Sequence, residues 1–286
     1  MLTSIRSLLA ASILATSAFA AAPAMAQDAG SGITISGNAA VVSDYRFRGV
    51  SLSDGDFAIQ GGIDVAHDSG FYIGTWGSSL ASFGNVTELD DGIGTVGSYD
   101  VGDYGAVEMN IYGGWSGDIT DGLTFNIGAL YYFFPNATNR DALVGPVGPS
   151  GYPTFGGYTD FDTDYLEFYT SLGTSLGPVS ATLGAAYAPE QDSLGGDDNL
   201  YIHLDLESGI PGTPLTLFGH IGYTSGVLAP EALATGTDDT GFDYSIGASF
   251  AINQNLSLSA AWVGTDATSI DDFTDDAIVA TLSFSF

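Results

Sequence analysis

Apolar and polar residues alternate with a period of two along most of this chain. In LTFNIGALYYF (residues 123–133), every second residue from Leu123 is apolar, whereas Thr124 and Asn126 occupy intervening positions. The run LYIHLDLE (200–207) shows the same pattern. Because successive side chains of an extended strand point to opposite faces, each run predicts a strand with one apolar face. Runs of this length are close to the roughly 9–11 residues that a tilted strand needs to cross a bilayer.

Similar runs follow one another along the chain, separated by connections of alternating length. Short connections include HDSG (67–70) and NQN (253–255), whereas long ones include residues 81–104 and 134–164. Outer-membrane barrels combine tight periplasmic turns with longer external loops in this way, and an even number of strands returns both termini to the periplasm. The expected strands are 33–45, 57–66, 71–80, 105–115, 123–133, 165–176, 179–188, 200–208, 215–224, 242–252, 256–264 and 277–286.

This pattern predicts an all-β fold, a transmembrane antiparallel up-and-down β-barrel of about 12 strands. We expect the barrel to occupy residues 27–286. A secreted β-sandwich also alternates, but it needs no regular rhythm of long and short loops. Barrel closure also satisfies every backbone hydrogen-bonding group without an exposed edge, as a lipid environment requires. We therefore favour the barrel.

Residues 1–26 have the features of a secretory signal peptide. Arg6 precedes a run of apolar and small residues, 8–22, and Ala24-Met25-Ala26 forms an A-x-A cleavage site. A second A-x-A motif would place the cut after Ala20. The apolar run is too short to cross a membrane as a helix. We expect export to the outer membrane, with membrane lipid as the immediate partner of the barrel.

Composition excludes several classes of protein. The chain has 34 Asp plus Glu but only four Lys plus Arg, giving a formal net charge of −30, or −31 without Arg6. No basic patch is available to bind the phosphates of a nucleic acid. The absence of cysteine excludes disulfides and cysteine-bound metals. With 45% hydrophobic residues, the chain is too apolar for an acidic disordered protein.

The last predicted strand, DAIVATLSFSF, ends in aromatic residues. Phe284 and Phe286 share one face with the apolar residues Ile278 and Leu282. An alternating final strand that ends in Phe resembles the assembly signal of outer-membrane proteins. The resemblance implies that the barrel assembly machinery and periplasmic chaperones are partners during biogenesis. The sequence shows no signal for an oligomeric interface, and we expect a monomer.

Two of the four arginines lie in the short segment SDYRFRG. If the first strand continues through this segment, Tyr45 and Phe47 point toward lipid, and Arg46 and Arg48 point inward beside Asp44. An arginine that faced lipid near the midplane would cost roughly 2–4 kcal/mol, whereas a lumen position carries no such penalty. The favoured interpretation is that the arginines bind inward acids and pin the barrel together. A selective role at a constriction and contact with lipid phosphates at the rim are the alternatives.

The same region carries a family resemblance. Residues 43–79 contain, in order, SDYRFRG, AIQGG and SGFYIGTW, and this combination resembles the opening hairpins of the TorF family of bacterial porins. Beyond residue 80 the likeness is one of architecture more than of motif. The resemblance implies an outer-membrane barrel with porin function. It supplies no substrate and no catalytic residue.

The inward faces of the predicted strands are acidic and aromatic. With Asp44, Arg46 and Arg48, the candidate pore-lining residues are Asp64, Glu108, Glu167, Asp205, Glu207 and Asp243. These charges predict a channel for passive diffusion of small hydrophilic solutes, with a preference for cations. The alternative is a non-conducting structural or surface barrel, because inward aromatic residues can fill a narrow lumen. The expected inward aromatic residues are Tyr72, Trp76, Tyr112, Tyr132, Tyr165, Tyr169, Tyr201 and Phe218.

Two histidines share the inward face with acids. If the turn between their strands centres near Pro211, His203 and His220 lie directly opposite each other, with Asp205 and Glu207 next to them. The favoured interpretation is a pair of lumenal histidines that hydrogen-bond to acids and water. Zinc ligation and a pH-sensitive network are the alternatives. No metal site and no cofactor are expected, and without a nucleophile motif we do not expect an enzyme.

The long external loops are rich in acids, as in TDFDTD and DDFTDD. They lack the glycine and the closing glutamate of an EF-hand loop, so we interpret them as solvated charges, with weak divalent binding as the alternative. The loop at 134–164 is long enough to fold inward and form a constriction.

Overall fold

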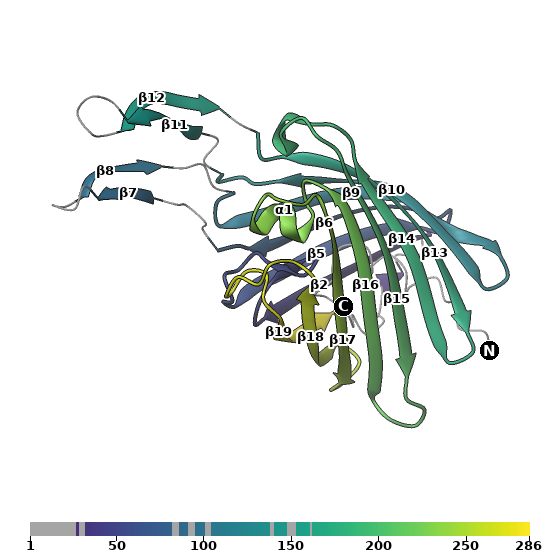
Figure 1. The fold of residues 1–286 in the computed structure, drawn as a ribbon. Helices are drawn as coiled ribbons and strands as arrows, with labels where there is room; N and C mark the ends of the chain where they lie inside the picture. Colours follow the sequence, from purple (N-terminus) through teal and green to yellow (C-terminus); the bar gives the residue numbers. More distant parts are fainter. Residues whose placement is uncertain are drawn as a thin grey trace.

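A computed structural model describes residues 27–28, 32–81, 86–90, 95–100, 104–137, 140–147, 153–160 and 162–286. Its main feature is a closed antiparallel barrel of twelve long strands (Figure 1). The barrel strands are β2 (Ile33–Val42), β5 (Ala58–His67), β6 (Phe71–Ser79), β9 (Val107–Thr120), β10 (Leu123–Phe133), β13 (Tyr165–Leu176), β14 (Val179–Ala188), β15 (Asn199–Gly209), β16 (Leu215–Gly226), β17 (Thr240–Ala251), β18 (Leu256–Thr265) and β19 (Ala277–Ser285). The predicted signal peptide lies outside the described residues.

Each of these strands pairs with the next one along the chain, and β2 closes the barrel by pairing with both β5 and β19. At the closing seam, the backbone amide of Phe286 donates to the carbonyl of Gly37 at 3.0 Å, and the amide of Gly37 donates back at 3.0 Å. The fold confirms the predicted up-and-down barrel. The largest differences in strand bounds are an earlier end of β2, at Val42, and a longer β9, which reaches Thr120.

Short elements precede β2 and occupy the connections between the barrel strands. β1 (Gln27–Asp28) pairs with β2, and β3 (Arg46–Phe47) pairs with β4 (Val50–Ser51). The connection after β14 contains the 3₁₀ helix η2 (Asp192–Leu194), and the connection after β16 contains helix α1 (Pro230–Ala234). No helix in the described part of the chain is long and apolar enough to cross a membrane.

Two hairpins lie in the long connections after β6 and β10. They are β7 (Val86–Asp90) with β8 (Thr95–Asp100), and β11 (Arg140–Val147) with β12 (Pro153–Asp160). Both project beyond the barrel at its long-loop end (Figure 1). Residues 134–164 are long enough to fold into the barrel, but the described part of that loop forms no constriction there, because its residues pair with each other as an external hairpin.

Alternation along each strand separates an apolar outside from a polar and aromatic inside. The outward side chains of Ile59, Ile246 and Ile278 are 70%, 63% and 77% exposed. Such a wide apolar outer surface suits lipid, where the backbone must find its hydrogen-bond partners within the closed sheet. All eight aromatic residues expected inside are buried.

The segment after β2 does not follow the predicted parity. Tyr45, expected to face lipid, is only 3% exposed, and its hydroxyl donates to Glu108 at 3.1 Å. Phe47 is half-buried and makes an edge-on contact with Tyr132 at a centroid distance of 6.0 Å. The prediction for both rings is wrong because the chain leaves the sheet after Val42 and folds back into the barrel.

Candidate functional site: a charged lumen with an inserted hairpin

Residues 43–56 form a small hairpin that fills part of the lumen near the long-loop end. β3 and β4 are joined by the two-residue turn of Arg48 and Gly49, whose φ angles are 50° and 81°. Positive φ at both central residues is the pattern of a type I′ turn, which suits the twist of a tight hairpin. Glycine reaches this conformation freely, whereas a side-chain-bearing residue such as Arg48 rarely does. The turn therefore holds Arg48 in a fixed position inside the barrel.

Asp44 organises the base of this inserted hairpin. Its carboxylate accepts hydrogen bonds from the hydroxyls of Ser51 at 2.6 Å and Ser53 at 3.1 Å. It also forms an ion pair with Nε of Arg46 at 2.5 Å. Because Asp44 and Arg46 are both buried, the pair offsets the desolvation that either charge would suffer alone.

Arg46 ties the hairpin to the loop between β18 and β19. Its Nη1 donates to the carbonyl oxygens of Gly49, at 3.1 Å, and Asp275. Its Nη2 lies 3.3 Å from the carboxylate of Asp275. The guanidinium thus joins the hairpin to a loop that is 229 residues away in sequence, and it does not face lipid headgroups.

Arg48 reaches the opposite wall of the barrel. Its Nη2 pairs with Oε1 of Glu167 at 2.5 Å, and its guanidinium lies 4.4 Å from the centre of the Tyr201 ring. Tyr132 donates to the other carboxylate oxygen of Glu167 at 3.2 Å. Glu108 is buried beside this network and accepts a hydrogen bond from Asn110 at 2.8 Å. Charged and aromatic groups therefore close much of the outer half of the lumen.

A second polar layer lies deeper in the barrel. Asp64 accepts a hydrogen bond from the hydroxyl of Tyr112. The hydroxyl of Tyr72 bonds to Asn126 and to the hydroxyl of Tyr169, both at 2.7 Å. Asp64 keeps partial exposure, in contrast to the buried acids of the outer half. This layer therefore leaves a charged group in contact with solvent.

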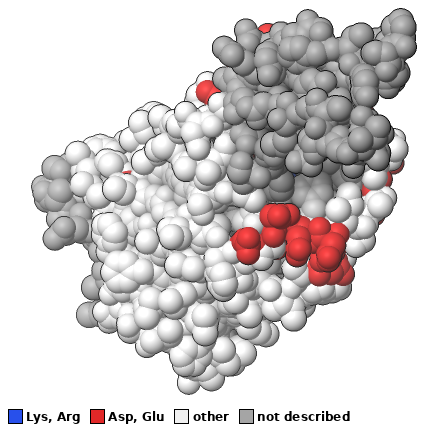
Figure 2. Space-filling model, turned by 90° about the vertical axis from the view of Figure 1, so that its left-hand side faces the viewer, with Lys and Arg blue, Asp and Glu red and all other residues white. Residues whose placement is uncertain are grey.

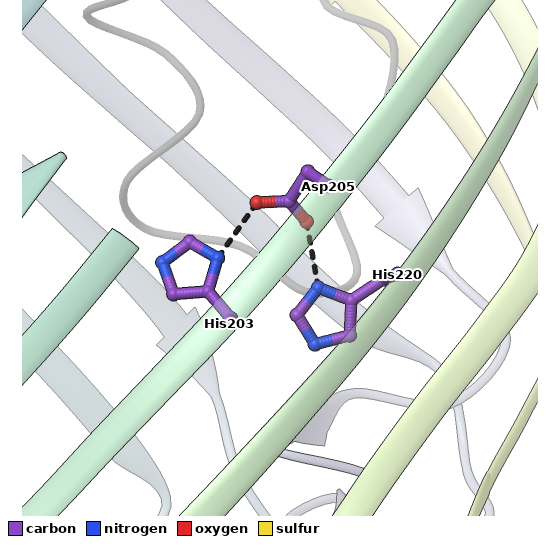
Figure 3. A group of neighbouring side chains, drawn as sticks. All are labelled: His203, Asp205 and His220. Atoms are coloured by element: carbon purple, nitrogen blue, oxygen red, sulfur yellow. Dashed lines mark hydrogen bonds and ion pairs between the residues drawn. The ribbon is translucent and has the colours of Figure 1, made fainter. Parts of the chain in front are cut away.

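A third group of side chains lies on β15, β16 and β17 (Figure 3). Asp205 accepts hydrogen bonds from Nδ1 of His203 at 2.7 Å and from Nδ1 of His220 at 2.6 Å. Nε2 of His220 lies 2.9 Å from Asp243, and the hydroxyl of Tyr201 donates to the same carboxylate at 3.2 Å. The structure thus gathers two histidines around one acid and sets a second acid behind His220.

The predicted direct pairing of the two histidines is wrong by two residues. His220 lies opposite Asp205, and His203 lies opposite Gly222. The turn is centred between Gly212 and Thr213, whereas the prediction placed its centre near Pro211. The two imidazoles nevertheless remain neighbours, with ring centres 5.8 Å apart.

The remaining expected site residues are not joined to these groups. Glu207 lies two residues beyond Asp205 on the same face of β15 and is exposed. Phe284 and Phe286 are exposed on the outside of β19 and its end, and their role as an assembly signal stays a prediction. From the sequence, Asp275 belongs only with the solvated acids of DDFTDD, because a loop residue carries no periodic signal for a distant ion pair.

Acidic side chains gather on the outer surface at the long-loop end (Figure 2). Asp272 lies close to Asp271, Asp275 and Asp54, and their negative charges, that of Asp271 foremost, raise its pKa above the usual value. The entrance to the barrel therefore carries a negative field. Such a field raises the local concentration of cations.

The closed barrel, its apolar outer surface and its charged interior are the features of a transmembrane β-barrel, and its fold resembles that of outer-membrane barrels. The chain belongs to the Gcw_chp family, described as bacterial protein of unknown function, whose model matches residues 26–147 and 144–286. No curated protein matches the chain.

Solved structures with a similar fold include one porin and two toluene transporters. The NanC porin is 9% identical with a TM-score of 0.49, and the match covers 88% of this chain and 98% of that one. The toluene transporter TbuX of Ralstonia pickettii is 13% identical, with a TM-score of 0.49 and coverage of 90% and 89%. The toluene transporter TodX of Pseudomonas putida is 12% identical, with a TM-score of 0.49 and coverage of 89% of both chains.

Proposed function

We propose that the protein is a narrow porin-type channel of the outer membrane that passes small hydrophilic solutes and prefers cations. The observation that carries this proposal is the imbalance of charge on the inward side of the described barrel strands and the inserted hairpin, where seven acids outnumber two arginines. The acids are Asp44, Asp64, Glu108, Glu167, Asp205, Glu207 and Asp243. An acidic lumen with low-dielectric walls attracts cations and repels anions. The resemblance of residues 43–79 to the TorF family of porins supports the same function.

The inserted hairpin limits what can pass. Arg46 and Glu167 are each only 2% exposed, so little water surrounds the charges of the outer half. A solute can pass this layer only if the hairpin shifts or if a narrow path runs beside it. We therefore expect low single-channel conductance with frequent closures, and no passage of large solutes.

A non-conducting barrel is the second candidate, and the same buried layer favours it. Tyr132 and Tyr165 stack with a centroid distance of 4.3 Å beside the Arg48–Glu167 pair. If these groups never separate, the barrel serves only as a structural or surface protein. In that case the ion pairs act on stability alone.

A planar-bilayer measurement separates the two functions. The full chain is expressed in a Gram-negative host, and folded protein is purified from the outer-membrane fraction, which also tests the location. The mass of the purified protein shows whether residues 1–26 have been removed by cleavage after Ala26. A KCl gradient should then give a reversal potential of cation-selective sign that weakens at high salt, because salt screens the lumenal acids.

Two variants sharpen this measurement. Asp64→Asn with Glu207→Gln should lower the cation preference, because both acids keep contact with solvent. The matched control Glu190→Gln removes an exposed acid from the connection after β14 and should leave the preference unchanged. Anion selectivity of the native chain would overturn the proposal. Inserted, folded barrels that give no current, even in the Gly49→Ala variant, whose added Cβ would meet Thr265 and Gly264 and release the hairpin, would establish the non-conducting candidate instead.

A further inference from the structure

We propose that His203, Asp205 and His220 bind one divalent transition-metal ion, of the kind represented by Zn²⁺, on the wall of the lumen. The site does not depend on whether the barrel conducts. It rests on the arrangement of three donor groups on two paired strands and on the groups that surround them.

The backbone of the barrel brings the three side chains together. Asp205 and His220 are directly opposite each other on β15 and β16. His203 precedes Asp205 by two residues and so projects from the same face of β15. The nitrogen and oxygen atoms that could serve as ligands all lie within 4.8 Å of one another. Small rotations of the side chains would bring them to the bond lengths of a metal site, about 2.0–2.2 Å for Zn²⁺.

Both imidazoles aim the same ring nitrogen, Nδ1, at Asp205 (Figure 3). A metal ion at this point would replace the protons that the carboxylate now shares with the two rings. On binding, His203 and His220 would each present an unprotonated Nδ1, and Asp205 would supply an oxygen. Any proton that the rings give up passes to lumenal water.

The groups behind His220 form the second half of the site. Its other nitrogen, Nε2, faces Asp243 at 2.9 Å, and Tyr201 donates to Asp243 at 3.2 Å. Histidines that bind a metal usually donate their second N–H to a carboxylate, which fixes the ring and strengthens it as a ligand. Asp243 and the side chain of His220 are buried, so this orientation is set by the protein and not by solvent.

Glycines make room for the imidazole of His203. Gly184 on β14 and Gly222 on β16 are its two neighbours across the sheet. A Cβ atom at Gly184 would collide with the His203 ring, and one at Gly222 would collide with the Tyr201 hydroxyl and Asp243. The sheet thus carries no side chain at the two inward positions where one would displace His203 or the residues that support the site, Tyr201 and Asp243.

The donor set selects the class of metal. Two imidazoles with one carboxylate suit Zn²⁺, Ni²⁺ or Cu²⁺, whereas Ca²⁺ and Mg²⁺ prefer oxygen ligands alone. The side chains of His203 and Asp205 are 20% and 12% exposed, so an ion with a bound water can approach from the lumen. The charges of Asp205 and Asp243 favour a cation at this position.

The test uses Co²⁺ as a spectroscopic probe and Zn²⁺ as its competitor. Protein without a polyhistidine tag is purified from the outer membrane, freed of metal with a chelator, and titrated with Co²⁺. We expect one equivalent to give the visible absorption of a nitrogen-ligated, low-coordinate ion, and one equivalent of Zn²⁺ to displace it. Absence of this absorption, with Zn²⁺ binding no tighter than to the His203→Gln variant, would overturn the proposal.

The variants assign the ligands. His203→Gln, His220→Gln and Asp205→Asn should each weaken Co²⁺ binding at least tenfold, and Asp243→Asn should weaken it about 10–100-fold through the orientation of His220. The matched control is His67→Gln, because His67 lies at the end of β5, bonded to Ser69 at 2.7 Å, away from the site. Equal binding by the His67→Gln and His203→Gln variants would overturn the assignment.

Heat-modifiable mobility in gels shows whether each variant still forms the barrel. His203 is the most exposed of the three ligands, so His203→Gln is the variant that disturbs folding least. As an independent readout, Zn²⁺ should raise the midpoint of thermal unfolding of the native chain and of His67→Gln, because a ligand that binds the folded state stabilises it. A folded His203→Gln barrel that gains the same stabilisation would contradict the site.

Discussion

The Nη2 atom of Arg48 lies 2.5 Å from Oε1 of Glu167, and the two side chains are 4% and 2% exposed. The pair connects the inserted hairpin to β13, on the wall of the barrel, across 119 residues of sequence. A buried pair adds little over a well-packed apolar pair, but removal of one partner leaves an uncompensated charge. The hairpin is therefore held more by the penalty of separating the charges than by their attraction.

Removal of one charge from this pair should strongly destabilise the barrel. We expect Glu167→Gln and Arg48→Met each to lower the free energy of unfolding by about 3–5 kcal/mol, because each leaves the other charge buried and unpaired. The double variant should lose less than the sum of the two single losses. Unfolding in urea from lipid vesicles measures all three. Additive losses would show that the two side chains are not coupled.

The turn at Arg48 and Gly49 should control whether the hairpin stays inside the barrel. Gly49→Ala should release it, because an alanine in the left-handed region costs roughly 1–2 kcal/mol. Its Cβ would also meet the side chain of Thr265 and lie 2.9 Å from the carbonyl of Gly264. Arg48→Asn removes the charge but keeps a sequence, Asn-Gly, that favours a type I′ turn. Comparing it with Gly49→Ala therefore separates the effect of the charge from the effect of the turn.

Cysteine labelling measures this release, because the chain contains no cysteine of its own. Val50 is 0% exposed, so the thiol introduced by Val50→Cys should react slowly with a water-soluble maleimide. Adding Gly49→Ala should accelerate the reaction at least tenfold. Asp56→Cys, at an exposed position, should react fast in both backgrounds. Fast labelling of Val50→Cys in the otherwise native chain would contradict the inserted hairpin.

The outward face of β17 tests whether lipid surrounds the barrel. Ile246 lies near the middle of this strand and is 63% exposed. In a bilayer, Ile246→Arg should lower the free energy of unfolding by roughly 2–4 kcal/mol, whereas an exposed arginine in water would change little. The control Gln254→Arg places the same charge in the exposed turn after β17 and should be neutral. Equal stability of both variants in lipid vesicles would contradict a transmembrane position.

Period-two alternation predicted the strands and their inward faces because side-chain direction depends only on local geometry. It could not show where a strand leaves the sheet. Nothing in the sequence before Tyr45 distinguishes continued pairing from the inward fold that follows Val42. Arg48 and Gly49 can be recognised as the turn of a hairpin only once the end of β2, at Val42, is known.

The candidate site was predictable to a similar degree. Alternation along each strand predicted which acids and histidines face the lumen. The partner of each charge, however, depends on the pairing register between neighbouring strands. A shift of two residues in the β15–β16 turn changed the residue opposite His220 from His203 to Asp205. The contact of Arg46 with Asp275 joins two loops that are 229 residues apart, and no local pattern encodes such a contact.

Glu231, in helix α1 of an external loop, should titrate far below an ordinary glutamate. Its carboxylate accepts hydrogen bonds from the hydroxyl of Thr235 at 2.6 Å and from the backbone amide of Thr268 at 2.5 Å. The Thr235 bond first, and then the Thr268 bond, lower the pKa of Glu231 to about 2. Both bonds favour the charged form, and the Thr268 bond ties helix α1 to the loop after β18 most strongly while the carboxylate is ionised.

The sign of the pH effect follows from this lowered pKa. The stability that Glu231 contributes is fully present above its unfolded pKa, near 4.5, and is lost as the pH falls toward its folded pKa of about 2. In this window the amide of Thr268 should exchange with solvent faster as the pH falls, once the intrinsic exchange rate is divided out. Carbon NMR of the Glu231 carboxyl gives the titration midpoint directly, and Glu231→Gln should abolish the pH dependence at Thr268. A midpoint near 4.5 would show that the two threonines do not hold the carboxylate, and that helix α1 is free of the neighbouring loop.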